Sequence, residues 1–389
     1  MACILVTGAA LLARSLITLR QVNPGFERQH VVTMQTPSGD RRLASAAQAL
    51  RVFDEGLQRL AALPGVDSVT VTLTGVPLAQ GGALRVDVVG RPVEQQYMTS
   101  WDLVTPQYFA ALGFRLLAGR GGNERDRRGA TPVAIINETM ARQLWPGESP
   151  LGRQIRIGMG GGPAWDEAVT REIVGVVSDV RQFGLSRPPI AGTYVPFAQI
   201  PDAQMAWFHE RSAAATWIVR TAPVGGPTAS AVERALQGAT ALPVTATRTM
   251  DEVFAAATAP AAQNAWLMAT LGGLSMLVAI VGVFALTLYA VTQRTHEMAI
   301  RLAVGAQPHA VRRLVVGRTM RIGLWGIAAG VTASAGFATW LRSSLYGVDA
   351  HDPLVFTVVP VMLACAVLAA AYLPARRASQ LDPVVVLRE

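Results

Sequence analysis

Residues 265–292 read AWLMATLGGLSMLVAIVGVFALTLYAVT, a run of 28 positions without a charged side chain. About 20 apolar residues in a helix span the roughly 30 Å hydrocarbon core of a bilayer. Two further runs, Ile322–Leu341 and Pro353–Ala375, are also uncharged and long enough. Only 15% of all residues are charged and the mean hydropathy is +0.33. We therefore predict an integral membrane protein with complete spans at about 265–292, 322–342 and 354–374.

The basic residues are unevenly distributed along the chain. No lysine occurs, so all 34 basic residues are arginines. Residues 22–262 contain 22 arginines against 21 acidic residues, whereas the rest of the chain contains 12 against five. The excess of positive charge thus lies beside the apolar runs, where it reports membrane topology. A nucleic-acid partner is not expected.

Loop charges indicate which segments face the cytoplasm. The connection 293–321 carries six arginines against Glu297 alone: Arg294, Arg301, Arg312, Arg313, Arg318 and Arg321. The loop Ser343–Asp352 has no arginine, and its Asp349 and Asp352 are expected to end two helices. The tail 375–389 contains three arginines. Because loops rich in Arg stay on the cytoplasmic side, we expect 293–321 and the C-terminal tail to be cytoplasmic. The large polar segment then lies outside.

The first 20 residues, MACILVTGAALLARSLITLR, are apolar but interrupted at Arg14. The uncharged part is too short to span a bilayer, and it has no positively charged region before it, as a signal peptide would. We interpret residues 1–20 as the end of a truncated first spanning helix. A short N-terminal anchor is the alternative.

Residues 21–262 have the pattern of an α+β domain. A strand, a helix and a strand are expected within about 28–75, and the same order recurs within about 214–260, as alternating and helical periodicities indicate. Between these two units lies an insert rich in strands. There, Asn137 is expected to cap a short helix that runs to Leu144. The predicted fold is thus a membrane α-helical protein with a large α+β extracytoplasmic domain at 21–262, followed by a permease domain at 263–389.

The basic connection has the features of a helical elbow. Glu297 and Arg301 have the i,i+4 spacing of a helix-surface ion pair. Gly305 suits a helix end, and Pro308 suits the first turn of a second helix. The alternative is a basic juxtamembrane loop that only satisfies topology and anionic lipid.

Small residues recur at helical spacing in the second complete span. Gly326, Gly330 and Ser334 lie on one face, where small side chains let two helices approach closely in lipid. This stripe is expected to pack, either on a helix of a second copy or on another helix of the same chain.

Several motifs resemble the MacB/FtsX-like ABC transporter permeases. RTHEMAIRLAVGAQPHAVRRLV (294–315) is similar to the cytoplasmic segment of that family, and PARRASQLDPVVVLRE (374–389) to its C-terminal signature. TPQYFAALGFRLLAGR (105–120), PVAIINETMARQLWPGESPLGRQIRIG (132–158) and IVGVVSDVRQFGL (173–185) resemble its extracytoplasmic domain. The resemblance covers nearly the whole chain in the same order.

The resemblance implies a permease of the bacterial inner membrane with four spanning helices and a MacB-like periplasmic domain between the first and second. Such permeases form dimers of two copies or halves, bind an ABC ATPase and couple ATP hydrolysis to movement of the periplasmic domain; a periplasmic adaptor can join them. The expected ATPase contact consists of Glu297, Arg301, Gly305, Ala306 and Arg312. The truncated first helix departs from the family and suggests a fragment, or the C-terminal half of a duplicated, ADOP-type permease.

Catalytic chemistry is not expected in this sequence. A nucleotide-binding P-loop requires a lysine, which the chain lacks. Its five histidines have no metal-ligand spacing, and no G-x-S-x-G motif occurs. We therefore predict no catalytic, cofactor-binding or metal residues, with ATP and Mg²⁺ held by a partner. The alternative function is a membrane-anchored signalling protein that controls a periplasmic partner enzyme.

Overall fold

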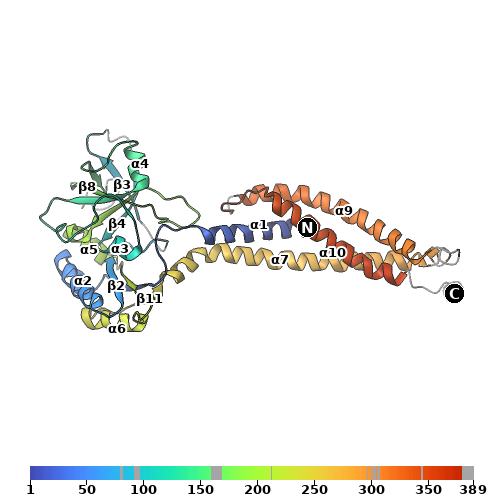
Figure 1. Cartoon of the computed structure of the whole chain (residues 1–389), viewed down its shortest axis with the longest axis horizontal. Helices are drawn as coiled ribbons and strands as arrows, with labels where there is room; N and C mark the ends of the chain where they lie inside the picture. Colours follow the sequence, from blue (N-terminus) through green and yellow to red (C-terminus); the bar gives the residue numbers. More distant parts are fainter. Residues whose placement is uncertain are drawn as a thin grey trace. The chain divides into compact units, whose positions relative to one another are not determined.

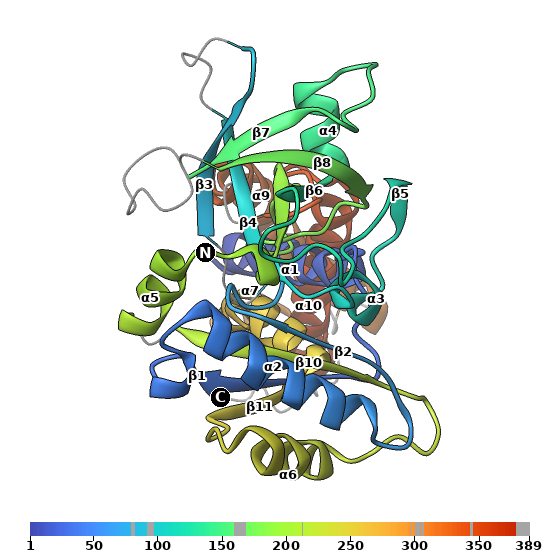
Figure 2. The same cartoon turned by 90° about the vertical axis from the view of Figure 1, so that its left-hand side faces the viewer.

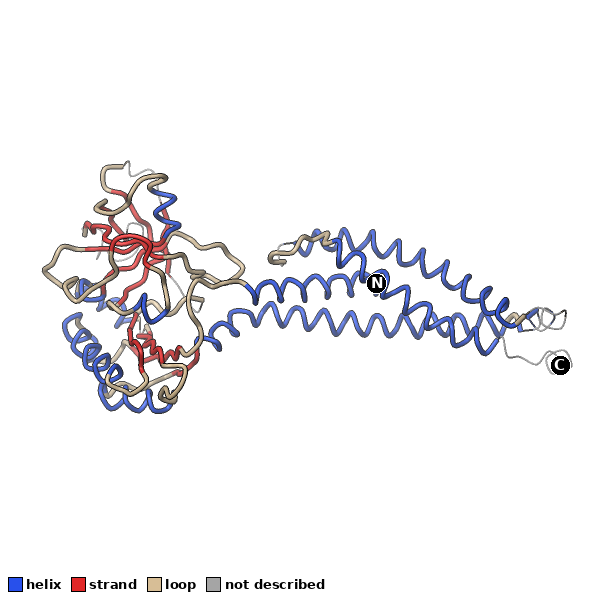
Figure 3. The backbone as a smooth tube through the Cα atoms, viewed as in Figure 1, coloured by secondary structure: helices blue, strands red, loops and turns tan. Residues whose placement is uncertain are grey.

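The computed structural model describes residues 1–78, 82–91, 97–158, 169–211, 213–295, 297, 298, 300, 304, 307–342 and 345–378. They form two units. Residues 22–257 are an α+β unit, and residues 1–21 with 258–389 are a helical unit. Figure 3 shows that the strands belong to the first unit, whereas the second consists of long helices.

The α+β unit is built on one mixed sheet. Its strands are β1 (Val31–Pro37), β2 (Val66–Thr72), β3 (Gly82–Val88), β4 (Tyr97–Val104), β5 (Leu116–Gly119), β6 (Val133–Asn137), β7 (Gln154–Ile157), β8 (Thr170–Val177), β9 (Gly192–Pro196), β10 (Ala214–Thr221) and β11 (Ala246–Thr249). They are ordered β11-β1-β10-β2-β4-β3-β7-β8-β6-β9, with β5 paired to β8 and a parallel contact between β4 and β9. The sheet thus consists of two parts that join where β2 meets β4.

The first part contains the two predicted strand–helix–strand segments. β1 lies between β10 and β11, antiparallel to both, so the two segments interleave in one sheet. Helices α2 (Ala46–Ala61) and α6 (Ala229–Thr240) pack on each other beside these strands; Figures 1 and 2 show both next to β1, β2 and β11. Ser45 and Thr228 cap the two helices with their side-chain oxygens. Phe53 of α2 meets the ring of Trp217 on β10 edge-on, with 5.5 Å between centroids.

The second part contains β3 to β9 with α3 (Tyr108–Leu112), α4 (Glu138–Leu144), α5 (Asp202–Glu210) and the 3₁₀ turn η2 (Phe197–Gln199). A second 3₁₀ turn, η1 (Arg41–Leu43), belongs to the first part. The predicted cap of α4 is confirmed, because the Asn137 side chain accepts a hydrogen bond from the Met140 N–H at 3.0 Å. The same side chain donates to the Ile190 carbonyl at 2.7 Å and so fixes the start of α4 against the segment before β9.

The helical unit contains α1 (Ala2–Gln21), α7 (Met250–Thr292), α9 (Pro308–Leu341) and α10 (Pro353–Ala378). All four are long and apolar enough to cross a membrane. The sequence predicted three complete spans, but α1 continues as a helix through Arg14 and reaches 20 residues. The Arg14 side chain forms an ion pair with Asp352 of the same unit, and this pairing permits a charge in an otherwise apolar helix.

Two helices are longer than the predicted spans. The Glu252 N–H donates to Thr249 Oγ1 at 3.2 Å while the Thr249 N–H donates to the Glu252 carboxylate at 2.9 Å, so a capping box starts α7 well before residue 265. The predicted helix at Pro308 is confirmed, but it continues without a break into the predicted span at 322–342. Asp352 does begin α10, whereas Asp349 ends no helix, because α9 stops at Leu341.

Candidate coupling site at the basic ends of the helices

The basic ends of three helices converge on a small apolar cluster within the helical unit. The buried members of this cluster come from all three helices and from the segment before α9. They are Val291 of α7, Met298 of the segment before α9, Val311 and Val315 of α9, and Ala375 of α10. Arginines flank these apolar positions in the sequence, including Arg294, Arg312 and Arg376. The apolar contacts hold the helix ends together, while the charged side chains around them stay available at the surface.

Two of the five predicted coupling residues lie within the described part of the chain. Glu297 is exposed beside the buried Met298. Arg312 is half-buried, and its buried Nε has no hydrogen-bond partner among the described residues. The other three, Arg301, Gly305 and Ala306, lie outside the described residues.

The described residues before α9 have helical backbone. Thr295, Glu297, Met298 and Ile300 are helical, and the Met298 N–H donates to the Arg294 carbonyl at 3.0 Å. After Gln307, α9 begins with Pro308 in its first turn, where the missing N–H of proline costs no hydrogen bond. The chain therefore leaves α7 and enters α9 through helical turns on both sides of the undescribed positions.

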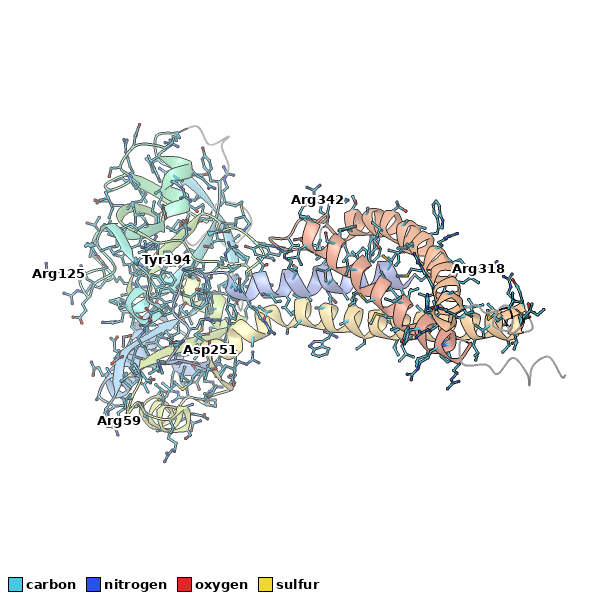
Figure 4. The ribbon with its side chains drawn as sticks, turned by 45° about the vertical axis from the view of Figure 1, so that its right-hand side comes forward. Arg59, Arg125, Tyr194, Asp251, Arg318 and Arg342 are labelled. Carbon is cyan, nitrogen blue, oxygen red and sulfur yellow. The ribbon has the colours of Figure 1, made fainter. Side chains whose placement is uncertain are left out.

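Charged residues of this segment border a cavity of about 1410 Å³ in the helical unit. Apolar side chains of α7 and α9 form much of its wall. The charged lining residues are Arg294, Glu297, Arg313, Arg318 and Arg321. Figure 4 shows Arg318 on α9, far from Arg342 at the other end of the same helix. Glu297 is the one negative charge among these five lining residues.

The predicted packing stripe has one open position and two packed ones. A Cβ added at Gly330 would lie 2.6 Å from Cβ of Cys3 on α1, so this close approach requires glycine. Ser334 donates a hydrogen bond to the Gly330 carbonyl at 2.7 Å and also contacts the Cys3 sulfur. Gly326 has no described neighbour within 4 Å and borders the cavity instead. Within the chain, this stripe therefore packs α9 on α1.

The α+β unit contains a buried carboxyl group that the sequence did not reveal. Asp102 on β4 is fully buried; its Oδ1 accepts hydrogen bonds from Thr74 Oγ1 at 2.9 Å and Gln182 Nε2 at 3.3 Å. Its Oδ2 has no partner among the described residues, and the same is true of the buried Tyr108 hydroxyl. Burial raises the pKa of Asp102 to about 7, and the Thr74 hydrogen bond only partly opposes this rise.

Two buried tyrosines surround the same carboxyl group. Burial and then the charge of Asp102 raise the pKa of Tyr108 and Tyr194 well above 10. Their ring centroids lie 6.1 Å apart, and Figure 4 shows Tyr194 inside the α+β unit. This group lies where the two parts of the sheet are joined by a single residue pair, Thr72 with Val104. Asp102, Tyr108 and Tyr194 thus form a buried polar cluster between the two parts of the sheet. Because all three are buried, the cluster has a structural role and is not an open binding site.

Within the described residues, no three His, Cys, Asp or Glu side chains gather where they could hold a metal ion. Asp40 shows the opposite electrostatics to Asp102, because its hydrogen bonds from Arg42 lower the pKa of its carboxyl to about 2. Such a surface ion pair is typical of a stabilised charge at a turn, here the cap of η1.

Comparison with known proteins now identifies the family. A model of the MacB-like periplasmic core domain matches residues 1–239, and a model of the FtsX-like permease C-terminal domain matches residues 269–383. The macrolide export ATP-binding/permease protein MacB 1 of Aeromonas hydrophila is 29% identical over 90% of this chain and 50% of its own length. A MacB of Rhodospirillum rubrum is 25% identical over 98% of this chain and 56% of its own length. The chain thus spans about half the length of these relatives.

The periplasmic region of MacB from Actinobacillus actinomycetemcomitans is a solved structure with a weak likeness. It aligns over 62% of this chain and 95% of its own, at 15% identity and a TM-score of 0.39. The assignment therefore rests on the sequence matches. Together with the four apolar helices, they identify an inner-membrane protein with an extracytoplasmic domain. Since the periplasmic core model covers more than half of the residues, this chain belongs to the MacB/FtsX-like family of ABC transporter permeases.

Proposed function

We propose that this chain is the permease part of an ABC transporter and that it passes movement from a partner ATPase to its extracytoplasmic domain. The observation that carries the proposal is the continuity of α7. This helix of 43 residues begins within the α+β unit and ends at the small apolar cluster that contains Val291. At 1.5 Å per residue it is about 65 Å long, roughly twice the bilayer core. The helix continues through Pro260, where one intrahelical hydrogen bond is missing, and a continuous helix transmits displacement between its ends.

The proposed orientation places the basic helix ends and the C-terminal tail in the cytoplasm. Among the described residues, seven arginines lie at these ends against Glu297: Arg294, Arg312, Arg313, Arg318, Arg321, Arg376 and Arg377. The connection between α9 and α10 carries Asp349 and Asp352 against one arginine, Arg342. The positive-inside rule supports this arrangement, because arginine-rich segments are retained on the cytoplasmic side.

In this proposal the ATPase docks at the elbow, and the five predicted residues position it without catalysing anything. Glu297, Arg301 and Arg312 supply charge to this contact, and Gly305 and Ala306 complete the predicted set. ATP and Mg²⁺ bind to the partner, since this sequence has no lysine for a P-loop. A second copy or a second permease half completes the complex. The names of the relatives support export as the direction of transport.

The ATPase contact is tested by co-purification of the full-length protein from its native membrane. Glu297→Arg turns the one acidic side chain of a basic surface into another positive charge. Because the proposal has Glu297 contact the ATPase, reversing its charge removes that contact. We expect the amount of ABC ATPase that co-purifies to fall about tenfold or more, which corresponds to ~1.4 kcal/mol of lost binding free energy. Glu210→Arg is the matched control, because Glu210 is an exposed glutamate of α5 in the other unit. Its variant should retain the ATPase fully.

The outcomes separate the contact from the function. If the unaltered protein retains no ABC ATPase, then the permease proposal is wrong, and regulation of a periplasmic enzyme becomes the better hypothesis. If Glu297→Arg retains as much ATPase as Glu210→Arg, the contact lies elsewhere.

The orientation is tested with a single cysteine at the exposed Gln307. In a background with both native cysteines replaced by serine, an impermeant maleimide should label Gln307→Cys only after spheroplasts are permeabilised. Labelling in intact spheroplasts would overturn the orientation. Ser230→Cys, on α6 of the extracytoplasmic domain, provides the control that must label in both conditions.

A further inference from the structure

A charge inside the first apolar helix has a specific partner. Arg14 of α1 forms an ion pair with Asp352, which lies at the start of α10. The Asp352 side chain is only 9% exposed, so the negative charge depends on its partners. An ionised side chain in an apolar span is costly unless it is paired. This pair therefore selects one arrangement of α1 and α10.

Two further contacts hold the same face of α1 to the connection between α9 and α10. The Tyr346 N–H donates to Ser15 Oγ at 2.7 Å. At Gly347, an added Cβ would lie 2.8 Å from the Thr18 methyl group, and the backbone there has φ +62°, which favours glycine. Arg14, Ser15 and Thr18 are spaced so that they share one side of the helix. The connection thus contacts α1 over more than one turn.

Asp352 has a second role that links the ion pair to α10 itself. Its Oδ1 accepts a hydrogen bond from the Leu354 N–H at 2.9 Å, so it caps the helix that it begins. The carboxylate also lies at the positive end of the α10 dipole. One side chain therefore joins the start of α10 to the middle of α1.

The fourth helix, α7, packs less closely on the other three. α1, α9 and α10 pack on one another extensively. α7 contacts α1 at Gly272, where an added Cβ would lie 3.3 Å from the Leu5 carbonyl oxygen, and at Ala265, which is buried with Leu12; its backbone approaches the other three helices less closely elsewhere among the described residues. Large apolar side chains of α7 are exposed along its length, including Trp266, Leu274 and Leu286. Both α1 and α7 lead into the extracytoplasmic domain, because residues 22–257 lie between them.

We infer that Arg14 and Asp352 are positioning residues that fasten α1 to the connection between α9 and α10. The three helices then move as one body, and α7 moves against them. The consequence for transport rests on the proposed function, since it makes the change between α1 and α7 the movement that reaches the extracytoplasmic domain. The ion pair itself is a property of the chain and does not depend on an ATPase.

The test uses the full chain in lipid nanodiscs, with both native cysteines replaced by serine and two pairs of spin labels. One pair, at Ile17 of α1 and Leu354 of α10, reports the fastened helices. The other pair, at Ile17 and Leu267 of α7, reports the movement. All three positions are more than half exposed, so labels fit without disturbing the core.

The variants separate the ion pair from the helix cap. Asp352→Asn removes the charge and keeps a good capping residue, and Arg14→Gln removes the other charge. Each should broaden the distance distribution between Ile17 and Leu354. The double variant Arg14→Gln with Asp352→Asn leaves no unpaired charge, so it should recover part of the narrow distribution. If Arg14 or Asp352 only filled space, then the double variant would not recover the narrow distance distribution that each single variant lost.

The inference is wrong if both single variants keep the distribution as narrow as the unaltered protein. The proposed function is judged separately, by adding the co-purified ATPase with ATP to the unaltered protein. We expect the Ile17–Leu267 distance to change, the Ile17–Leu354 distance to stay constant, and Asp352→Asn to lose the first response. No change in either distance on adding ATP to the unaltered protein contradicts mechanical coupling and leaves the ion pair to be decided by the distributions alone.

Discussion

Replacing Asp102 with asparagine should change how the stability of the extracytoplasmic domain depends on pH. Burial raises the pKa of Asp102 from its ordinary value of 3.8 to about 7. The folded state therefore holds the proton more tightly than the unfolded state. The stabilisation is fully present below pH 3.8 and is lost as pH rises through 7. A shift of roughly three units at 1.36 kcal/mol each corresponds to about 4 kcal/mol.

Asp102→Asn mimics the protonated side chain at every pH. Its carbonyl oxygen can still accept hydrogen bonds from Thr74 and Gln182, which both bond to Oδ1 of the native residue. We expect the variant to match the unaltered protein near pH 4 and to be more stable by up to about 4 kcal/mol at pH 8.5. For a unit of this size that is a rise in Tm of about 8–16 °C.

The assay is thermal unfolding of the full chain in nanodiscs at a series of pH values, followed by the fluorescence of the buried Trp101 and Trp217. Asp40→Asn is the control. Its carboxyl has a lowered pKa of about 2, so its stabilisation is lost only as pH falls through 2 and contributes no slope between pH 4 and 8.5. Equal pH slopes for Asp102→Asn and the unaltered protein would refute the reasoning.

Two packing predictions concern glycines in helices. Gly56→Ala places a Cβ 2.4 Å from the fully buried ring of Trp217, and this overpacking should cost about 1–3 kcal/mol in urea unfolding, whereas Gly238→Ala, which meets nothing within 4 Å, should not destabilise. Gly330→Val should push α1 from α9 and speed maleimide labelling of the buried cysteine of α1, while Gly326→Val, at an open position, should leave labelling unchanged. Destabilisation by Gly238→Ala, or equal labelling in the last two variants, would contradict the packing described above.

Elements with local signals could be predicted from the sequence. The apolar runs predicted α7, α9 and α10, because length and hydropathy suffice for a spanning helix. The N-cap at Asn137 was found because capping needs only one polar side chain before a helical pattern. The capping box of Thr249 and Glu252 is equally local, and reading it would have extended α7 to its true start.

Short and irregular elements were missed for a physical reason. β5 (Leu116–Gly119) and β7 (Gln154–Ile157) have four residues each, too few for an alternating pattern to show. They exist because β8 offers hydrogen-bonding partners to both. Tertiary pairing decides such strands, and a single sequence does not contain that information in readable form.

In the candidate site, too, features with local signals could be predicted, whereas features that depend on tertiary contacts could not. The start of α9 at Pro308 is a local signal and could be predicted, whereas the turn expected at Gly305 lies outside the described residues. The neighbours of Asp102 and the pairing of Arg14 with Asp352 join residues that are remote in the sequence. Residues 1–20 were predicted as part of a spanning helix, which α1 confirms, but the partner of Arg14 could not be predicted because it is remote in the sequence.

The two helices that lead into the extracytoplasmic domain are consequently stabilised in different ways. α7 starts with its own cap and satisfies its backbone groups within itself apart from the hydrogen bond that Pro260 removes, and an apolar helix needs no packing partner to persist in lipid. α1 carries Arg14, which is 42% exposed and pairs with the Asp352 side chain, which is only 9% exposed. An apolar helix can change its neighbours at little cost, whereas separating α1 from α10 leaves the Asp352 carboxylate without this partner. This difference favours α7 as the element that moves.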